Sequence, residues 1–255
     1  MLLCIKSGIA DMKTFKIDSS PEAVRRSVEN ATKILDGKKK IDLFGCARVD
    51  QNVPIEDTMK VLQDLVDEGK IGGIQLSEVK AETIQRAAKV AKIDMVEAEV
   101  SLWATDIFEN GVAETCAQLG ITVVAHTPLG AGMLTGHIKS LADMPANDHH
   151  RYFPRFQPEN FQKNLDLVVE LSKLADIKGC TTAQLALCWI KSRSKTPGMP
   201  VIIPVFGARS EERVKENTKE VDLTVADLKV IDNILDSFPV AGHRYPVAAA
   251  KLAEY

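Results

Sequence analysis

A histidine and a threonine stand where an apolar run turns abruptly polar. Residues 121–132 spell Ile-Thr-Val-Val-Ala-His-Thr-Pro-Leu-Gly-Ala-Gly, a β-branched run that predicts a buried strand and breaks at His126 into a glycine-rich turn. In parallel α/β proteins, the loop that leaves the carboxyl end of a strand faces the ligand. We therefore expect His126, Thr127 and the main-chain amides of residues 130–132 to contact a cofactor. An ordinary strand-to-helix turn is the alternative.

The long segment after this strand, residues 127–158, holds a second group of polar and aromatic side chains. It contains Asp148-His149-His150-Arg151, with aromatic residues directly after it. Connections of this length are usually functional or disordered, and we interpret this one as a substrate lid. His149 and His150 are adjacent and lack the spaced acidic or cysteine partners of a metal site, so we predict that no metal binds here.

The elements that must position these residues alternate regularly along the chain. Strands and helices recur every 25 to 30 residues or so, a spacing that is typical of parallel strands joined by crossover helices. The predicted strands cover residues 2–5, 41–46, 71–76, 93–100, 121–126 and 201–204. The predicted helices cover residues 21–36, 55–68, 81–91, 108–119, 159–174, 181–192 and 223–235, with one more through 213–217.

This count gives about six strand-helix units, fewer than the eight that close a barrel. An open sheet of the Rossmann type is the rival architecture. It would need a Gly-x-Gly-x-x-Gly turn after an early strand, and the sequence has none.

Length and composition predict that residues 1–255 form a single domain. The chain is 45% hydrophobic, with mixed charges that sum to −3 and an isoelectric point near 6.0, so we expect no nucleic-acid partner. Five cysteines without paired or metal-ligand spacing fit a reducing cytoplasm. No stretch has the length of a membrane span or the pattern of a signal peptide, so we expect no membrane partner.

Four groups of residues repeat the motifs of one enzyme family. They are Asp42-Leu43-Phe44 with Arg48-Val49-Asp50; Leu76-Ser77-Glu78 with Ala81-Glu82-Thr83-Ile84; Ala125-His126-Thr127-Pro128-Leu129-Gly130 with Leu134-Thr135-Gly136; and 184–189 with Ile203-Pro204, Gly207-Ala208-Arg209 and 213–217. On these residues the chain resembles the aldo-keto reductases, which are NADPH-dependent (β/α)8 barrels, and among them the fungal pyridoxal reductases most. The likeness runs from Met1 almost to the C-terminus.

The resemblance implies a nicotinamide site at the ends of three strands. Ser77 and Glu78 would hold the carboxamide, and His126 would stack on the ring in place of the family's tyrosine. Glu97 stands where the family usually has a glutamine, so it accepts a hydrogen bond from the amide but has lost the donor.

The rest of the dinucleotide is implied to lie along the late turns. Thr127 and Leu129 would line the pyrophosphate. Arg209 and Arg213, at a helix start after Gly207, would bind the 2′-phosphate and so favour NADPH over NADH. Glu216 and Asn217 would reach the adenine. A solvated helix face is the alternative for the arginines.

The family's catalytic groups are only partly matched. Lys6 matches the lysine, but the histidine position falls on Ala47, and no residue matches the family's aspartate and tyrosine. The tyrosine is the acid that protonates the carbonyl oxygen. By this resemblance the chain is a (β/α)8 barrel of aldo-keto reductase type that lacks about the first two strand-helix units, with exposed sheet edges and an uncovered interior.

The resulting functional hypothesis is NADPH-dependent reduction of a small-molecule aldehyde, with pyridoxal favoured, by a cytoplasmic protein that is a monomer when complete. We expect activity to be impaired in this shortened chain. A non-catalytic nucleotide-binding interaction protein of the same fold is the first alternative. A barrel enzyme that uses the late loops for a phosphorylated substrate is the second.

Overall fold

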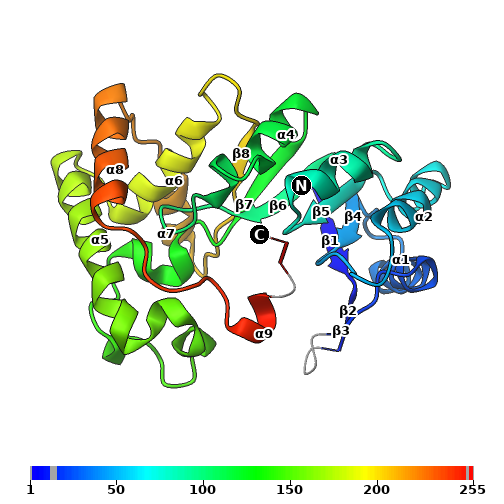
Figure 1. Cartoon of the computed structure of the whole chain (residues 1–255), viewed down its shortest axis with the longest axis horizontal. Coiled ribbons are helices and arrows are strands. Elements are labelled where there is room, and N and C mark those ends of the chain that lie inside the picture. Colours follow the sequence, from blue (N-terminus) through cyan, green and yellow to red (C-terminus); the bar gives the residue numbers. More distant parts are fainter. Residues whose placement is uncertain (1, 12–15, 251–252, 255) are drawn as a thin grey trace.

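The computed structural model describes residues 2–11, 16–250 and 253–254. Its centre is a six-stranded parallel sheet in the order β1-β4-β5-β6-β7-β8 (Figure 1). These strands are β1 (Cys4–Ser7), β4 (Leu43–Cys46), β5 (Ile74–Ser77), β6 (Met95–Glu99), β7 (Thr122–His126) and β8 (Ile202–Pro204). Each overlaps one of the six predicted strands, which confirms the parallel α/β prediction.

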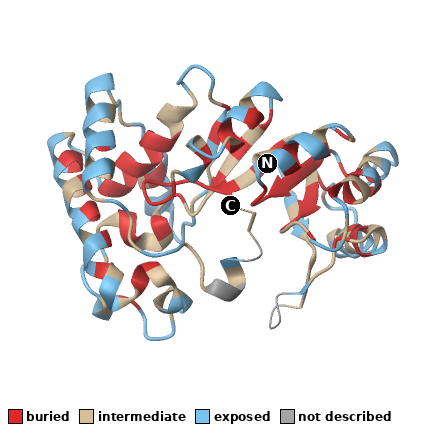
Figure 2. Ribbon diagram, viewed as in Figure 1, coloured by how far each residue is buried: buried red, intermediate tan, exposed pale blue. Residues whose placement is uncertain are grey.

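Helices follow the strands and cover the outside of the sheet (Figure 1). The α-helices are α1 (Pro21–Leu35), α2 (Ile55–Asp67), α3 (Ala81–Ala88), α4 (Val112–Gln118), α5 (Pro158–Ile177), α6 (Thr182–Arg193), α7 (Glu211–Thr218), α8 (Val225–Ser237) and α9 (Val247–Ala250). In α2, Ile55, Met59 and Leu62 recur at helical spacing and are buried. Burying each such side chain contributes about 2 kcal/mol of hydrophobic free energy. Figure 2 shows buried residues gathered on the sheet and on the inner sides of the helices.

Local capping explains where the helices begin. Thr181 and Gln184 form a reciprocal capping box at the start of α6, as the paired threonines of the sequence predict. Ser210 caps α7 by accepting a hydrogen bond from Arg213 N at 3.3 Å. This cap fixes the direction of the helix that carries the residues predicted to contact adenosine.

Two local features differ from the sequence prediction. The helix predicted over 108–119 is divided into the 3₁₀ turn η1 (Asp106–Phe108) and α4, because Gly111 has a φ of +83° that no α-helix accommodates. A short antiparallel hairpin of β2 (Ile9–Asp11) and β3 (Lys16–Ile17) was not predicted at all. Its strands are too short to show an alternating pattern.

The segment predicted as a long loop contains only short helical turns. They are η2 (Gly130–Thr135), η3 (Leu141–Asp143), η4 (His149–Tyr152) and η5 (Pro154–Phe156). Arg151 joins two parts of this segment, because its side chain donates hydrogen bonds to the main-chain carbonyls of Leu141 and Met144 at 2.7 and 2.9 Å. The segment is therefore an ordered connection from β7 to α5.

The sheet curves around a cavity of about 1160 Å³. Cys4 of β1 and Ile203 of β8, the two outermost strands of the sheet, both line it, together with Glu97 and His126 from the middle. The described residues thus form a barrel-like wall with an open side between β1 and β8. In the described part of the chain, no helix is long and apolar enough to cross a membrane.

Candidate functional site

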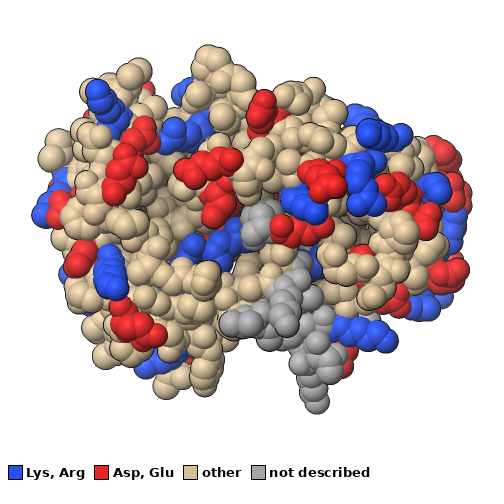
Figure 3. Space-filling model, in the orientation of Figure 1, with Lys and Arg blue, Asp and Glu red and all other residues tan. Residues whose placement is uncertain are grey.

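Strand register brings the predicted nicotinamide residues to one edge of the sheet. Ser77 pairs with Glu97 across β5 and β6, and Glu99 pairs with His126 across β6 and β7. Because the strands are parallel, their carboxyl ends meet at this edge, as expected for an α/β site. Figure 3 shows the molecule hollowed near the middle of one face, with charges of both signs around the hollow.

Lys6 and Glu97 form an ion pair across the open interior. Lys6 Nζ, at the end of β1, donates to Glu97 Oε1 on β6. Both side chains are partly buried, with 30% and 18% of their surfaces exposed. Lys6, predicted to match the family's lysine, is therefore paired with Glu97, predicted to stand in place of the family's glutamine.

Glu78 is buried and joined to His126. It has a φ of +56°, a conformation that costs energy for residues other than glycine and is found preferentially at functional turns. His126 Nε2 lies 2.6 Å from Glu78 Oε1, and His126 Nδ1 lies 3.0 Å from Thr127 Oγ1. Glu99 N also donates to Glu78 Oε1, at 3.0 Å.

These partners hold the carboxyl group of Glu78 ionised. Burial alone would raise its pKa, but the hydrogen bond from His126 and the charges of Arg244, His126 and Arg48 lower it to about 2. An ionised carboxylate can only accept hydrogen bonds, so His126 Nε2 carries the hydrogen between them. The tautomer and plane of the His126 ring are thereby fixed.

Three further charged residues complete this network: Glu99, Arg155 and Arg244. Arg244 donates to Glu78 Oε2, and its Nε lies 3.3 Å from Glu99 Oε2. Arg155 Nη1 lies 3.6 Å from Glu99 Oε1. Burial raises the pKa of Glu99 and lowers that of Arg155. Glu97 and Glu99 share one side of a strand, which is a signal that could have identified Glu99, whereas the two arginines lie in irregular segments without any pattern.

The turn after β7 has the strained geometry of a binding loop. Thr127 and Ala131 have φ values of +51° and +52°, and Gly130 and Gly132 have values of +56° and +97°. Leu129, predicted beside the pyrophosphate, lies within this turn and packs against the core. The N–H groups of Gly130 and Gly132, predicted to contact the cofactor, instead donate to the carbonyls of Thr127 and Leu129 at 2.9 and 3.0 Å, so they stabilise the turn itself.

The residues predicted around adenosine lie together near α7. Arg213 Nη1 donates to Glu216 Oε2 at 2.6 Å, and its Nη2 lies 3.3 Å from His137 Nε2 in the turn after η2. Arg209 is exposed beside them, and Asn217 is buried. Gly207 has open space where a side chain would stand. The structure therefore brings the two arginines to one exposed helix start, within reach of the turn after β7.

The fit of a nicotinamide can be tested at Ser77. Its Oγ is a buried atom with no hydrogen-bond partner among the described residues. It lies at the end of β5, next to Glu78 and in register with Glu97. A primary carboxamide offers an oxygen that the Ser77 hydroxyl can donate to and an NH₂ group that the carboxylates can accept from. The residues present fit this group.

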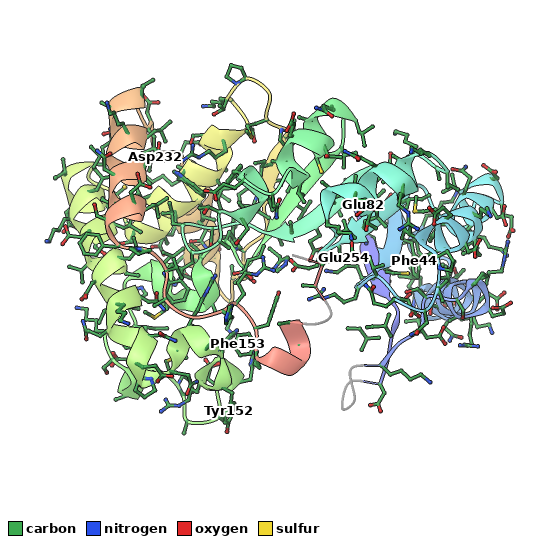
Figure 4. The ribbon with its side chains drawn as sticks, viewed as in Figure 1. Phe44, Glu82, Tyr152, Phe153, Asp232 and Glu254 are labelled. Atoms are coloured by element: carbon green, nitrogen blue, oxygen red, sulfur yellow. The ribbon has the colours of Figure 1, made fainter. Side chains whose placement is uncertain are left out.

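The predicted lid contributes to a small cavity beside the network. This cavity of about 60 Å³ is lined by Thr127, His150, Phe153 and Arg155 of the lid, together with Tyr245. Phe153 and Tyr245 contact edge to face, with ring centroids 6.2 Å apart. Figure 4 shows neighbouring Tyr152 projecting outward from this segment.

The lid also brings three possible metal ligands close together. Asp148, His149 and His150 each place one ligand atom within 4.8 Å of the others. Asp148 Oδ1 already accepts from the main-chain nitrogen and ring of His150, at 2.9 and 2.8 Å. Through these hydrogen bonds Asp148 caps the helical turn η4, which explains why the three side chains lie close together. That no metal binds here stays a prediction.

Comparisons with known proteins agree with this geometry. The sequence profile of the aldo/keto reductase family matches residues 2–236. The chain is 39% identical to "Probable pyridoxal reductase 2" of Schizosaccharomyces pombe over 253 residues, which cover 96% of this chain and 74% of that protein. It is 37% identical to the NADP(+) aldo-keto reductase yakc of the same yeast, over 91% of this chain and 68% of that protein.

Solved structures show the same fold. The structure of a glycerol dehydrogenase from Gluconobacter oxydans is similar with a TM-score of 0.77 and 26% sequence identity. The similarity covers 88% of this chain and 66% of that chain, so the chain spans just under two thirds of the length of that solved structure.

Proposed function

This chain belongs to the aldo/keto reductase family, and on that premise we propose that it binds NADPH and acts on aldehydes, with pyridoxal as the favoured substrate. The observation that carries the proposal is the Ser77 hydroxyl, which has no hydrogen-bond partner among the described residues and lies in register with Glu97 and beside Glu78 at the carboxyl edge of the sheet. The pyridoxal reductase name of a relative supports the substrate, and the NADP(+) in the name of another supports the cofactor.

The nicotinamide end would be held by groups that the structure already fixes. Ser77 would donate to the carboxamide oxygen, Glu97 would accept from its NH₂ group, and the His126 ring would offer a surface of fixed plane for stacking. When bound, NADPH supplies a hydride to the carbonyl carbon. The chain's contribution is orientation, because a stacked and hydrogen-bonded ring presents one face to the substrate.

The adenosine end would be held by the start of α7. Arg209 and Arg213 provide forked N–H donors beside a helix N-terminus, an arrangement that suits a phosphate monoester. Arg213 is engaged with Glu216. We propose that it turns from Glu216 to the 2′-phosphate, a dianion that attracts the guanidinium more strongly than one carboxylate does.

Proton supply is the weak step in this chain. Lys6 is paired with Glu97, and the histidine position is Ala47. Tyr245 lines the small cavity beside the network, but burial together with the charges of Glu78 and Glu99 raises its pKa to about 12. That shift is opposite to the one a general acid needs near neutral pH. We propose that the chain turns over aldehydes slowly.

Two measurements test the proposal. Titration with NADPH, followed by nicotinamide fluorescence, should show saturable binding, with weaker binding of NADH. Oxidation of NADPH in the presence of pyridoxal should be slow but above the background rate. Absence of saturable NADPH binding would contradict the proposal outright.

A second candidate function follows from the Lys6–Glu97 ion pair, which ties up the lysine that the reaction would use. It is a non-catalytic, nucleotide-binding interaction protein of the same fold. Tight NADPH binding combined with no oxidation of NADPH by pyridoxal or other aldehydes would favour this candidate.

We also propose a cytoplasmic location, with a small-molecule aldehyde as the partner. The five cysteines are all free, as is usual for proteins in a reducing compartment.

A further inference from the structure

The C-terminal tail, residues 238–246, crosses the carboxyl edge of the sheet. Figure 1 shows this coil running from the lower end of α8 to α9, below the strands of the sheet. Asn164, fully buried on α5, holds the tail by donating to Ala241 O at 2.9 Å and accepting from Ala241 N at 2.8 Å. Gly242 follows with a φ of +86°, and a Cβ there would lie 2.9 Å from the carbonyl of Pro154. The path of the tail is therefore fixed just before Arg244.

Arg244 enters the buried network from this tail. It donates to Glu78 and lies beside Glu99, and its side chain is only 9% exposed. The side chains of Glu78 and Glu99 are 0% and 9% exposed. Buried carboxylates persist in the ionised state only with a compensating charge close by. Arg244 is the residue that bridges both of them.

We propose that Arg244 is a positioning residue of the nicotinamide site, acting through Glu78 to fix the plane and tautomer of the His126 ring. The inference rests on the proposed binding of NADPH, because the ring is the surface on which the nicotinamide would stack. It assigns a part of the nicotinamide site to the C-terminal tail, whereas the sequence motifs place the nicotinamide residues at the strand ends alone.

The chain of contacts gives the physical reason. Among the residues that the structure describes, charged groups that act on Glu78 are His126 from β7, Arg244 from the tail, Arg48 after β4 and Glu99 from β6. In a variant without the Arg244 guanidinium, fewer positive charges offset the effect of burial on Glu78, so the pKa of its carboxyl group rises. A protonated carboxyl donates a hydrogen bond, so His126 Nε2 would become the acceptor and the ring hydrogen would move to Nδ1.

The first test uses the free protein and does not depend on a nucleotide. Two-bond ¹H–¹⁵N correlations of the His126 ring identify which nitrogen carries the hydrogen. We expect hydrogen on Nε2 in the wild type and a shift toward Nδ1, or averaging between the two, in Arg244→Gln. Arg244→Lys should lie between them, because an ammonium keeps the charge but loses the forked geometry. The matched control is Arg25→Gln, which removes an exposed arginine from the α1–α2 surface.

The second test separates positioning from unfolding. Binding of NADPH to Arg244→Gln should weaken by about tenfold, the usual scale for losing an ordered polar contact. Binding of 2′,5′-ADP, which carries the adenosine and 2′-phosphate but no nicotinamide, should be unchanged in the same variant. A far-ultraviolet circular dichroism spectrum equal to that of the wild type completes the comparison.

The outcomes are distinguishable. If the His126 spectrum of Arg244→Gln equals that of the wild type, the positioning role is wrong. It is also wrong if NADPH and 2′,5′-ADP weaken equally. If the wild type binds neither nucleotide while the His126 spectrum still changes, the proposed function fails and the control of His126 by Arg244 stands.

Discussion

Glu78 is the residue on which the site depends most, because it contacts His126 and Arg244 while fully buried. Its pKa of about 2 lies below the ordinary value of 4.5. A carboxyl group with a lowered pKa stabilises the fold above its ordinary pKa, and this stabilisation is lost as the pH falls toward the lowered value.

Replacing Glu78 by glutamine should therefore destabilise the protein most at neutral pH. We expect a loss of about 3 kcal/mol in the free energy of unfolding at pH 7, because Arg244 and Arg155 would then share Glu99 as their buried counter-charge. The difference between wild type and variant should shrink as the pH falls from 4.5 toward 2. Thermal unfolding at pH 7 and pH 3 measures both effects. An equal difference at the two pH values would contradict the assignment of the lowered pKa.

The arginines at the start of α7, Arg209 and Arg213, give a second prediction at the residue scale. The double variant Arg209→Gln, Arg213→Gln should bind NADPH about tenfold or more weakly, since each hydrogen bond to a charged group contributes roughly 1.5–3 kcal/mol before solvent screening. Binding of NADH, which has no 2′-phosphate, should hardly change. The ratio of the two dissociation constants is the measurement. A variant that keeps the wild-type ratio would place the 2′-phosphate elsewhere.

At the scale of elements, the sequence predicted what its local patterns encode. The period-2 and period-3.6 patterns identified all six strands of the parallel sheet, and the Thr181 cap marked the start of α6. The sequence also predicted that Ser77, Glu78 and His126 lie close together. They do, because they stand at the carboxyl ends of strands whose register follows from parallel pairing. The ion pairs of Arg155 and Arg244 with Glu99 and Glu78 were not predicted, since these partners are 56 and 145 to 166 residues away and no local pattern encodes such contacts.

The tail can be tested as an element through Gly242. Gly242→Ala should displace the tail, because the new Cβ would lie 2.7 Å from Asn160 Nδ2 as well as 2.9 Å from the Pro154 carbonyl. Gly198→Ala is the matched control: its φ of +81° imposes similar backbone strain, but its surroundings are open. We expect Gly242→Ala to be the less stable of the two by about 1–3 kcal/mol. Faster proteolytic cleavage after Arg244 would confirm that the tail has moved, and equal behaviour of the two variants would exclude a close contact.

At the scale of the whole molecule, the outermost strands and the interior between them determine how the chain behaves in solution. β1 and β8 form the two ends of the sheet, and the cavity that they border is mostly apolar. Ile203 and Val205 are half exposed there. Unpaired strand edges next to apolar surface favour pairing with another chain.

We therefore expect this chain to self-associate as its concentration rises. Light scattering after size exclusion should show a mass that increases over a tenfold range of concentration. The double variant Ile203→Lys, Val205→Lys should shift this increase to higher concentrations, because lysines on an edge oppose pairing by charge and by the cost of desolvation. Val225→Lys is the control, since Val225 is 85% exposed on α8, away from the cavity. If that control suppresses association equally, general surface charge is responsible and the open side between β1 and β8 is not the contact. If the edge variant alone suppresses it while 2′,5′-ADP still binds, the open side of the sheet and the late turns act independently.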